Sequence, residues 1–319
     1  MALTDDHLLS IYRHMVEGRM LELAIAKIKG NYHPAVGEEG VIIGTFYNLR
    51  KEDVVLPHFR GSIIVPYMRG ASLRRLFAGI PGKLTAYSHG RYRGDICGPF
   101  ELNVIGMYSG ALGSSLSLAI GAALAAKLKK TDNVAVVTFG DGTSNRGDFH
   151  EAINMAAVLN LPAVFVCQNN QYAVSTPFCR STLCRSIADR APGYGIPGAK
   201  VDGNDVEAVH LAVQEAVQRA RDGKGPTLIE ALTYRVLGHW VADPATYRSA
   251  QEVEEWKKKD PIDRLRKKLI ANGTLNELQV EQINKSMEEK LSVAIDEADK
   301  DPWPDQQILG LDDVFAGGR

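Results

Sequence analysis

The sequence predicts an α/β fold, a three-layer, doubly wound arrangement around a mostly parallel sheet, with helical extensions. Short apolar runs rich in β-branched residues alternate with segments of helical periodicity, which is typical of strands covered by helices on both faces. The 319 residues are 45% hydrophobic and 24% charged, an ordinary composition for a globular enzyme. We predict one domain over 1–319, with a core at about 30–249, an N-terminal helix over 1–29 and a C-terminal helical extension over 250–319.

The first part of the chain predicts helices around one short strand. Leu8, Tyr12 and Met15 recur on one face, as expected for an amphipathic helix. Small residues dominate the last of these helices, which allows close packing. The predicted elements are helix 5–29, helix 37–49, strand 51–56, helix 73–77, irregular loop 81–99 and helix 111–129.

A strand–loop–helix–strand unit occupies the middle of the chain. Apolar runs at 134–139 and 163–167 predict two buried strands. The stretch 140–147, rich in Gly, Ser and Asn, is expected to be a loop, and Asp148 to cap a helix over 149–159. Because such crossovers are right-handed, the two strands should be parallel, with their carboxyl ends at one edge of the sheet.

The remaining segments continue the alternation and then become helical. Ile283, Met287, Leu291 and Ile295 recur at steps of four, a stripe that indicates packing within the domain rather than a partner interface. The predicted elements are loop 176–191, strand 200–201, helix 205–221, strand 227–232 and a charged helical tail over 250–300.

Polar side chains follow both strands of the central unit. Gly140-Asp141-Gly142 ends the first run and Asn169-Asn170 ends the second. Ligands of open α/β sheets bind at this edge, and Mg²⁺ prefers carboxylate, carbonyl and phosphate oxygens. Glycines on both sides of Asp141 allow the backbone to approach a phosphate. The pattern favours a site for magnesium and a diphosphate over the alternative, a plain turn after a strand.

Charge and cysteine content exclude other classes of protein. The formal net charge is −1, which gives no electrostatic case for binding nucleic acid or an anionic membrane. No run approaches the ~18 apolar residues of a membrane span, and no secretory signal is visible. The four cysteines lack zinc-site and Cys-x-x-Cys spacings. We therefore expect a cytoplasmic protein with reduced thiols.

The spacing of Gly140-Asp141-Gly142, a helix and Asn169-Asn170 resembles the signature of thiamine diphosphate enzymes. The wider sequence resembles the α subunit of the E1 component of 2-oxo acid dehydrogenases, a family that includes pyruvate, branched-chain and acetoin enzymes. The likeness is strongest over 139–177, 192–205 and 226–249. It implies the diphosphate-binding module of the thiamine diphosphate fold, with thiamine diphosphate and Mg²⁺ as cofactors.

The resemblance also implies roles for individual residues. Asp141, Asn170 and the backbone carbonyl of Tyr172 would bind Mg²⁺, and Arg60 would clamp the diphosphate. His239 would act as an acid–base group, for which the ordinary histidine pKa of about 6.5 is suited. The residues implied to contact the cofactor are Phe59 (where tyrosine is usual), Arg60, Gly110, Leu112, Asp141, Gly142, Thr143, Asn170 and His239.

In the resembled family the cofactor decarboxylates a 2-oxo acid, and the acyl unit passes to a lipoyl group on an acyltransferase (E2). In E1 enzymes that are split into two chains, the glutamate that activates the cofactor belongs to the β subunit. No matching half is visible here, so we expect an α₂β₂ heterotetramer and no activity from this chain alone. The polar segment 176–190, which contains Arg180, Arg185 and Arg190, is expected to be mobile over the cofactor channel.

Departures from the family pattern leave the substrate open. Ser62 stands where a histidine is frequent, Leu237 replaces a second histidine of some pyruvate enzymes, and 93–98 replaces a Gly-Ser-Met-His segment. One alternative is the α subunit of a related two-carbon transferase, with a ketose phosphate or pyruvate donor and a lipoyl or carrier-protein acceptor. A second is a catalytically inactive partner subunit, against which the intact Arg60, Asp141 and His239 argue.

Overall fold

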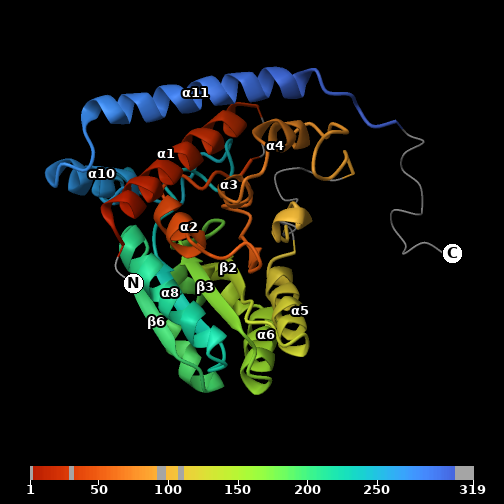
Figure 1. Ribbon diagram of the computed structural model, residues 1–319. Coiled ribbons are helices and arrows are strands. Elements are labelled where there is room, and N and C mark those ends of the chain that lie inside the picture. The colour runs from red at the N-terminus through yellow and green to blue at the C-terminus, as the bar shows by residue number, and fades with distance from the viewer. Residues whose placement is uncertain (1–2, 29–31, 92–97, 107–110, 306–319) are drawn as a thin grey trace.

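Five parallel strands form the central sheet in the order β1-β2-β3-β7-β6 (Figure 1). Strands β2 and β3 are buried along their whole length, as their apolar sequences predict. The computed structural model describes residues 3–28, 32–91, 98–106 and 111–305. The strands are β1 (Val54–Leu56), β2 (Ala135–Gly140), β3 (Ala163–Asn169), β6 (Gly198–Asp202) and β7 (Thr227–Leu232).

Helices cover both faces of the sheet, so the predicted doubly wound, three-layer α/β class is confirmed. On one face α5 (Ser114–Leu128) and α6 (Gly147–Val158) pack on Val137, Phe139 and Phe165. On the other face α2 (Glu39–Phe46) and α8 (Val206–Arg221) share a hydrophobic core with the opposite side chains of β2 and β3. Figure 1 shows α8 on one side of the strands and α5 with α6 on the other.

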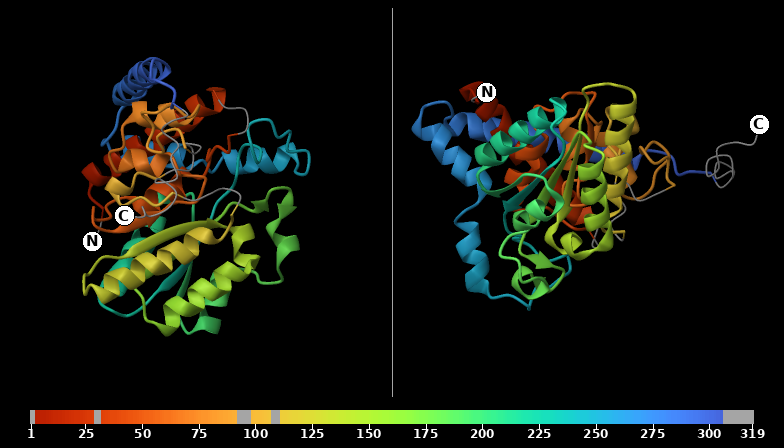
Figure 2. Two further views of the ribbon diagram at one scale, coloured as in Figure 1. Left: turned by 90° about the vertical axis from the view of Figure 1, so that its right-hand side faces the viewer. Right: turned by 90° about the horizontal axis from the view of Figure 1, so that it is seen from below.

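A helical layer lies beyond this α/β unit and is built from both ends of the chain. In the left view of Figure 2, the red, orange and blue helices lie above the yellow and green part that carries the sheet. The layer contains α1 (Asp5–Ile28), α3 (Ile64–Met68), α4 (Leu73–Gly79), α10 (Pro261–Ala271) and α11 (Glu277–Asp299), while α9 (Ala250–Lys257) links it to the strands.

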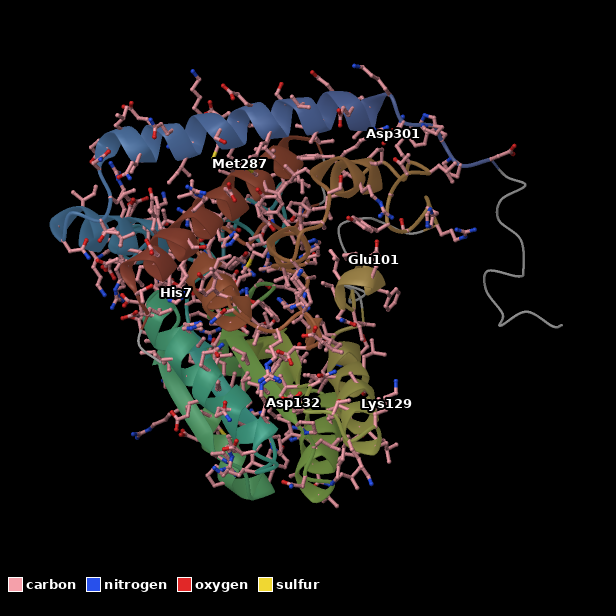
Figure 3. The ribbon with its side chains drawn as sticks, viewed as in Figure 1. His7, Glu101, Lys129, Asp132, Met287 and Asp301 are labelled. Carbon is pink, nitrogen blue, oxygen red and sulfur yellow. The ribbon has the colours of Figure 1, made fainter. Side chains whose placement is uncertain are left out.

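The long helix α11 runs across α1 and α4 and is held by the predicted apolar stripe. Met287 is fully buried against α1 and α4, and Ile283 and Leu291 are also buried (Figure 3). Just beyond the helix, Asp301 forms an ion pair with Arg74 of α4. The prediction that the stripe serves packing within the chain is confirmed. In the part of the chain that the structure describes, every helix is too short or too polar to cross a membrane.

Two local predictions were wrong. Asp148 does not cap α6, because the helix already begins at Gly147 and its first turn has no side-chain cap; Asp148 pairs instead with Arg146 at 3.0 Å. The segment 176–191 is not one irregular loop. It contains β5 (Thr176–Pro177), paired with β4 (Tyr172–Ala173), then α7 (Phe178–Ser181) and the start of the 3-10 helix η3 (Ala188–Tyr194).

Candidate active site

A cavity of about 350 Å³ opens at the carboxyl edge of β1, β2 and β3. Every site residue predicted from the sequence lines this cavity, except Gly110, which lies outside the described residues. Most of 93–98, the segment that departs from the family pattern, also lies outside them. The parallel register explains why, because Gly140 of β2 lies opposite Gln168 of β3 and the two polar motifs follow directly. The lining residues are His33, His58, Phe59, Arg60, Leu112, Gly140, Asp141, Gly142, Thr143, Asn170, Tyr172, Ala173, Val174 and His239.

Asp141 is the one acidic residue among the described residues that line this cavity. It begins the 3-10 turn η2 (Asp141–Asn145) directly after β2 and is 2% exposed. Within the described part of the chain its Oδ2 atom has no hydrogen-bond partner. Burial raises the pKa of Asp141 to about 7, because the charged form loses its hydration. A buried carboxylate oxygen without a partner costs free energy unless a ligand compensates it.

The glycine after Asp141 has a packing role. A Cβ on Gly142 would lie 2.7 Å from the Cβ of Ala173, so the turn after β2 fits against β4 only with glycine. A Cβ on Gly140 would be 3.3 Å from the imidazole of His58. The glycines predicted to admit a phosphate therefore also let the surrounding protein pack closely against η2.

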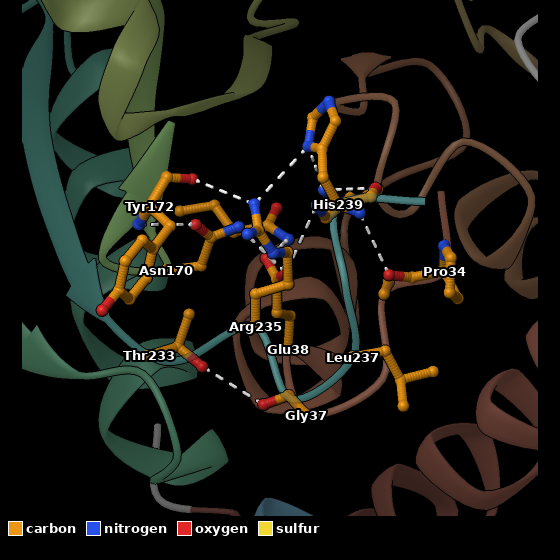
Figure 4. Close-up of polar contacts among 12 residues, drawn as sticks. Pro34, Gly37, Glu38, Asn170, Tyr172, Thr233, Arg235, Leu237 and His239 are labelled. Atoms are coloured by element: carbon orange, nitrogen blue, oxygen red, sulfur yellow. Dashed lines mark hydrogen bonds and ion pairs between the residues drawn. The ribbon is translucent and has the colours of Figure 1, made fainter. Parts of the chain in front are cut away.

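Asn170 is held from two sides, as Figure 4 shows. Its Nδ2 donates to Oε1 of Glu38 at 3.0 Å, and its Oδ1 accepts from the backbone N–H of Tyr172 at 3.3 Å. The carbonyl of Tyr172, the predicted third metal ligand, accepts a 3.3 Å hydrogen bond from Arg235. The hydroxyl of Tyr172 points away to Glu252 of α9, at 3.0 Å.

Arg60 is 1% exposed and its guanidinium is fixed by several acceptors. Nη1 donates to the carbonyl of Pro34 at 3.1 Å, and Nη2 lies 3.0 Å from both the carbonyl and Nδ1 of His239. Nε faces Glu38 at 3.5 Å. Burial lowers the pKa of Arg60 to about 10, so the side chain remains a cation at neutral pH.

The pKa of His239 departs from the ordinary histidine value on which its expected acid–base role rests. Burial, together with the neighbouring Arg60, lowers the pKa of His239 to about 3, far from the ordinary value near 6.5. The imidazole is therefore neutral at neutral pH. Because Arg60 can only donate, Nδ1 of His239 accepts and the ring proton resides on Nε2. The side chain is a hydrogen-bond donor here and a poor proton acceptor.

Aromatic rings and an aliphatic side chain form the apolar wall of the cavity. Phe59 packs against the rings of His58 and His33, with centroids 4.0 and 5.3 Å apart, and the guanidinium of Arg60 lies 4.9 Å from its centroid. Leu112 lines the cavity just ahead of α5. His33 also stands 4.9 Å from His239, ring to ring.

Sequence reasoning missed the roles of Glu38, Arg235, His33 and His58. The two acids Glu38-Glu39 at the start of an apolar helix were a visible signal, since acids at such a position are rarely buried without a partner. Arg235 gave no comparable signal. Its guanidinium reaches the carbonyls of Tyr172 and Val174, which lie far from it in the sequence.

Buried Arg60, the amide of Asn170 and an Asp141 oxygen without a partner in the described part of the chain form a polar site at the carboxyl edge of the parallel sheet. This is where α/β enzymes bind their ligands. The model of the dehydrogenase E1 component family matches residues 8–307. The chain belongs to this family, which is thiamine diphosphate-dependent. The resemblance deduced from the motifs is confirmed, and the transferase alternative is not favoured.

Three relatives that are named for different substrates are almost equally similar to this chain. The α subunit of acetoin:2,6-dichlorophenolindophenol oxidoreductase from Bacillus subtilis (strain 168) is 38% identical, over 99% of this chain and 95% of the relative. The α subunit of 2-oxoisovalerate dehydrogenase from the same organism is 37% identical, over 99% and 97%. The pyruvate dehydrogenase E1 component subunit alpha of Staphylococcus aureus (strain COL) is 38% identical, over 93% and 79%. Identities this similar do not distinguish the substrate.

Proposed function

We propose that this chain is the α subunit of a thiamine diphosphate-dependent 2-oxo acid or acetoin dehydrogenase. We further propose that Asp141, Asn170 and the carbonyl of Tyr172 hold the Mg²⁺ that binds the cofactor's diphosphate. The observation that carries the proposal is the buried Oδ2 of Asp141, which lacks a partner in the described part of the chain and lines the same cavity as Asn170. A divalent cation would compensate that oxygen, and Mg²⁺ accepts this combination of carboxylate and carbonyl ligands.

One arginine lines the cavity and a second lies next to it, which fits the diphosphate part of such a ligand. Arg60 belongs to the lining, whereas Arg235 contacts the carbonyl of Tyr172 beside it. Both side chains are fully buried, and Glu38 faces Arg60. Guanidinium groups bind phosphate oxygens through charge-assisted hydrogen bonds. Nε2–H of His239 adds a neutral donor next to them. This arrangement supports a diphosphate at the edge of the sheet, between the proposed metal ligands and Arg60.

The apolar wall supports the organic part of the cofactor. When bound, thiamine diphosphate would supply a carbanion that attacks the carbonyl carbon of a 2-oxo acid. It would also supply an electron sink for the electron pair released as CO₂ leaves. Phe59 and Leu112 would exclude water from this part of the cavity, which strengthens the electrostatic interactions inside it. His239, being neutral, would donate a hydrogen bond rather than remove a proton.

We propose that a β subunit completes the site in an α₂β₂ heterotetramer and that a lipoyl-bearing acyltransferase accepts the product. Relatives at 36–38% identity are named as α subunits, which supports a partner chain. The cytoplasmic location and the mobility of 176–190 stay predictions. In the structure, Arg190 ties that segment to Asn145 at 2.8 Å and also contacts Thr182 within the segment at 2.9 Å.

The test combines binding and turnover. Thiamine diphosphate is titrated calorimetrically into the chain alone and into the chain co-purified with a β subunit, with Mg²⁺ and again with EDTA. We expect Mg²⁺-dependent binding, and CO₂ release from 2-oxo acids or dye reduction with acetoin only when β is present. Strong decarboxylation by the lone chain would refute the split site. Binding that is indifferent to EDTA would refute the metal site.

A further inference from the structure

The two amides of the Asn169-Asn170 motif are held by two different buried carboxylates. Nδ2 of Asn170 donates to Oε1 of Glu38 at 3.0 Å, and Nδ2 of Asn169 donates to Oε1 of Glu230 at 2.6 Å. Both acids are fully buried. Only the first pair borders the cavity, because Asn170 lines it and Asn169 does not. Figure 4 shows Glu38 next to Arg235, with Asn170 to one side of them.

Glu38 is engaged through both of its oxygens. Oε2 accepts a 2.6 Å hydrogen bond from Nε2 of Gln168, while Oε1 accepts from Asn170 and faces Nε of Arg60 at 3.5 Å. Glu38 therefore joins the diphosphate-clamping arginine and the metal-binding asparagine. It precedes α2, whose apolar residues fix its backbone in the core.

This contact determines which atom of Asn170 can reach a metal ion. A carboxamide can present either its oxygen or its NH₂ group, and only the oxygen binds a cation. A carboxylate accepts hydrogen bonds and donates none, so the NH₂ group of Asn170 must face Glu38. Oδ1 is then turned to the opposite side, where it lies 3.3 Å from the N–H of Tyr172.

We propose that Glu38 is the positioning residue of the metal site: it holds Asn170 so that Oδ1, and not Nδ2, is presented to the cation. This inference rests on the magnesium site proposed above and adds a residue to it. Groups that orient a ligand in this way change metal affinity by about 10- to 100-fold when they are removed.

A second explanation, simple charge, makes a different prediction. If Glu38 acted only through its negative charge, Glu38→Gln and Glu38→Met would be equally harmful. If it acts by orientation, Glu38→Gln retains most of the function, because its amide oxygen still accepts from Asn170 while Gln168 turns its own oxygen toward the new NH₂ group. Glu38→Met has a similar size and removes every acceptor.

The experiment measures Mn²⁺ binding to the full chain by electron paramagnetic resonance, with inorganic pyrophosphate as the anionic probe. We expect Glu38→Met to weaken Mn²⁺ affinity at least tenfold and Glu38→Gln to remain within about threefold of the wild type. Glu230→Gln is the matched control. It alters the acid that holds Asn169, so it should lower the melting temperature and leave Mn²⁺ affinity unchanged.

Each outcome decides between the possibilities. Equal affinity in wild type and Glu38→Met overturns the positioning role and leaves the metal site standing. Equal losses in Glu38→Met and Glu38→Gln, or a loss in Glu230→Gln as large as in Glu38→Met, also overturn it. Failure of the wild type to bind Mn²⁺ with pyrophosphate overturns the metal site and this inference with it.

A second pair of variants covers the case in which Glu38→Met does not fold. Asn170→Asp alone places two carboxylates side by side and should bind Mn²⁺ poorly. Adding Glu38→Gln supplies an NH₂ group to the new carboxylate, which has an oxygen on either side and needs no orientation. We expect the double variant to regain the affinity, and failure to do so in a folded protein overturns the proposal.

Discussion

Two buried carboxylates near the carboxyl edge of the sheet differ in how many hydrogen bonds they accept. Glu230 of β7 accepts hydrogen bonds from Asn169, from the hydroxyl of Ser186 and from the backbone N–H of Ile187 at 2.8 Å. Asp141 after β2 has one oxygen with no partner in the described part of the chain. Both side chains are almost completely buried. The saturated acid holds the structure together, whereas the unsatisfied one is the group that needs a ligand.

Removing the unsatisfied carboxylate should have the largest effect on function. Asp141→Asn preserves shape but removes the charge on the proposed metal ligand, so we expect Mg²⁺-dependent affinity for thiamine diphosphate to fall by at least 100-fold, which is about 2.7 kcal/mol. Titration calorimetry on the complex with the β subunit measures it. The control is Asp148→Asn, which alters a surface acid of α6 and should bind normally. Tight, Mg²⁺-dependent binding by Asp141→Asn would show that the Asp141 carboxylate is not required for the metal, contrary to its contrast with Glu230.

The same substitution should stabilise the protein without ligand. The pKa of Asp141 is about 7 in the folded chain, against an ordinary value of 3.8. Because the folded pKa is the higher one, the folded state binds more protons between about pH 4 and pH 7, and stability falls as pH rises through that window. The shift of about 3 units corresponds to at most ~4 kcal/mol. Burial also raises the pKa of Glu22, to about 8, so the pH dependence of the wild type alone does not isolate Asp141.

Urea unfolding of wild type and Asp141→Asn at pH 5 and pH 8, without metal or cofactor, isolates the contribution of this one group. We expect the variant to be more stable at pH 8 by up to a few kcal/mol, and by less than half as much at pH 5, where the wild type has lost only the first part of this stability. A variant that is less stable than the wild type at pH 8 would show that Asp141 is satisfied by groups of the protein itself.

Glu230 should give the reverse result. Glu230→Ala leaves the amides of Asn169 and Ile187 without an acceptor, so we expect a loss of about 3 kcal/mol in stability, measured by urea unfolding. Limited proteolysis within 178–190 should become faster, since this acid fastens that segment to the sheet. Unchanged stability in Glu230→Ala would show that Glu230 does not stabilise the fold, which contradicts the structural role assigned to it here.

These contrasts also show what sequence reasoning could and could not reach. The strand tips were predictable, because apolar runs fix the strands and the crossover rule makes them parallel. The partners of Glu38 were not predictable, because Gln168 and Asn170 are 130 and 132 residues away in the chain. The failed cap at Asp148 has a similar cause, because its side chain lies against Gly113, where an added Cβ would come within 2.7 Å of it, and such a contact is tertiary.

For His239 the sequence predicted the position of the side chain but not its pKa. Its place in the cavity followed from the motif, but its acid–base role rested on the pKa of an isolated imidazole. Burial and Arg60 displace that value to about 3. We expect His239→Gln to lower kcat by about 10-fold at every pH from 5.5 to 8, since the wild-type ring is neutral throughout. A loss that appears only above pH 6.5 would support the acid–base role that the sequence predicts.

The smallest effect should come from Phe59, which stands where the family has tyrosine. Phe59 is half-buried, lines the cavity beside Arg60 and packs on His33 and His58, so its ring position is set by packing alone. Phe59→Tyr adds a hydroxyl without altering those contacts. If that hydroxyl reaches the diphosphate, it contributes about 1 kcal/mol, a fivefold gain in cofactor affinity. Calorimetry in parallel with Phe59→Leu, which loses the aromatic packing, separates the two contributions. An affinity unchanged by tyrosine but reduced by leucine would mean that this position serves the apolar wall alone and that Arg60 holds the phosphate unaided.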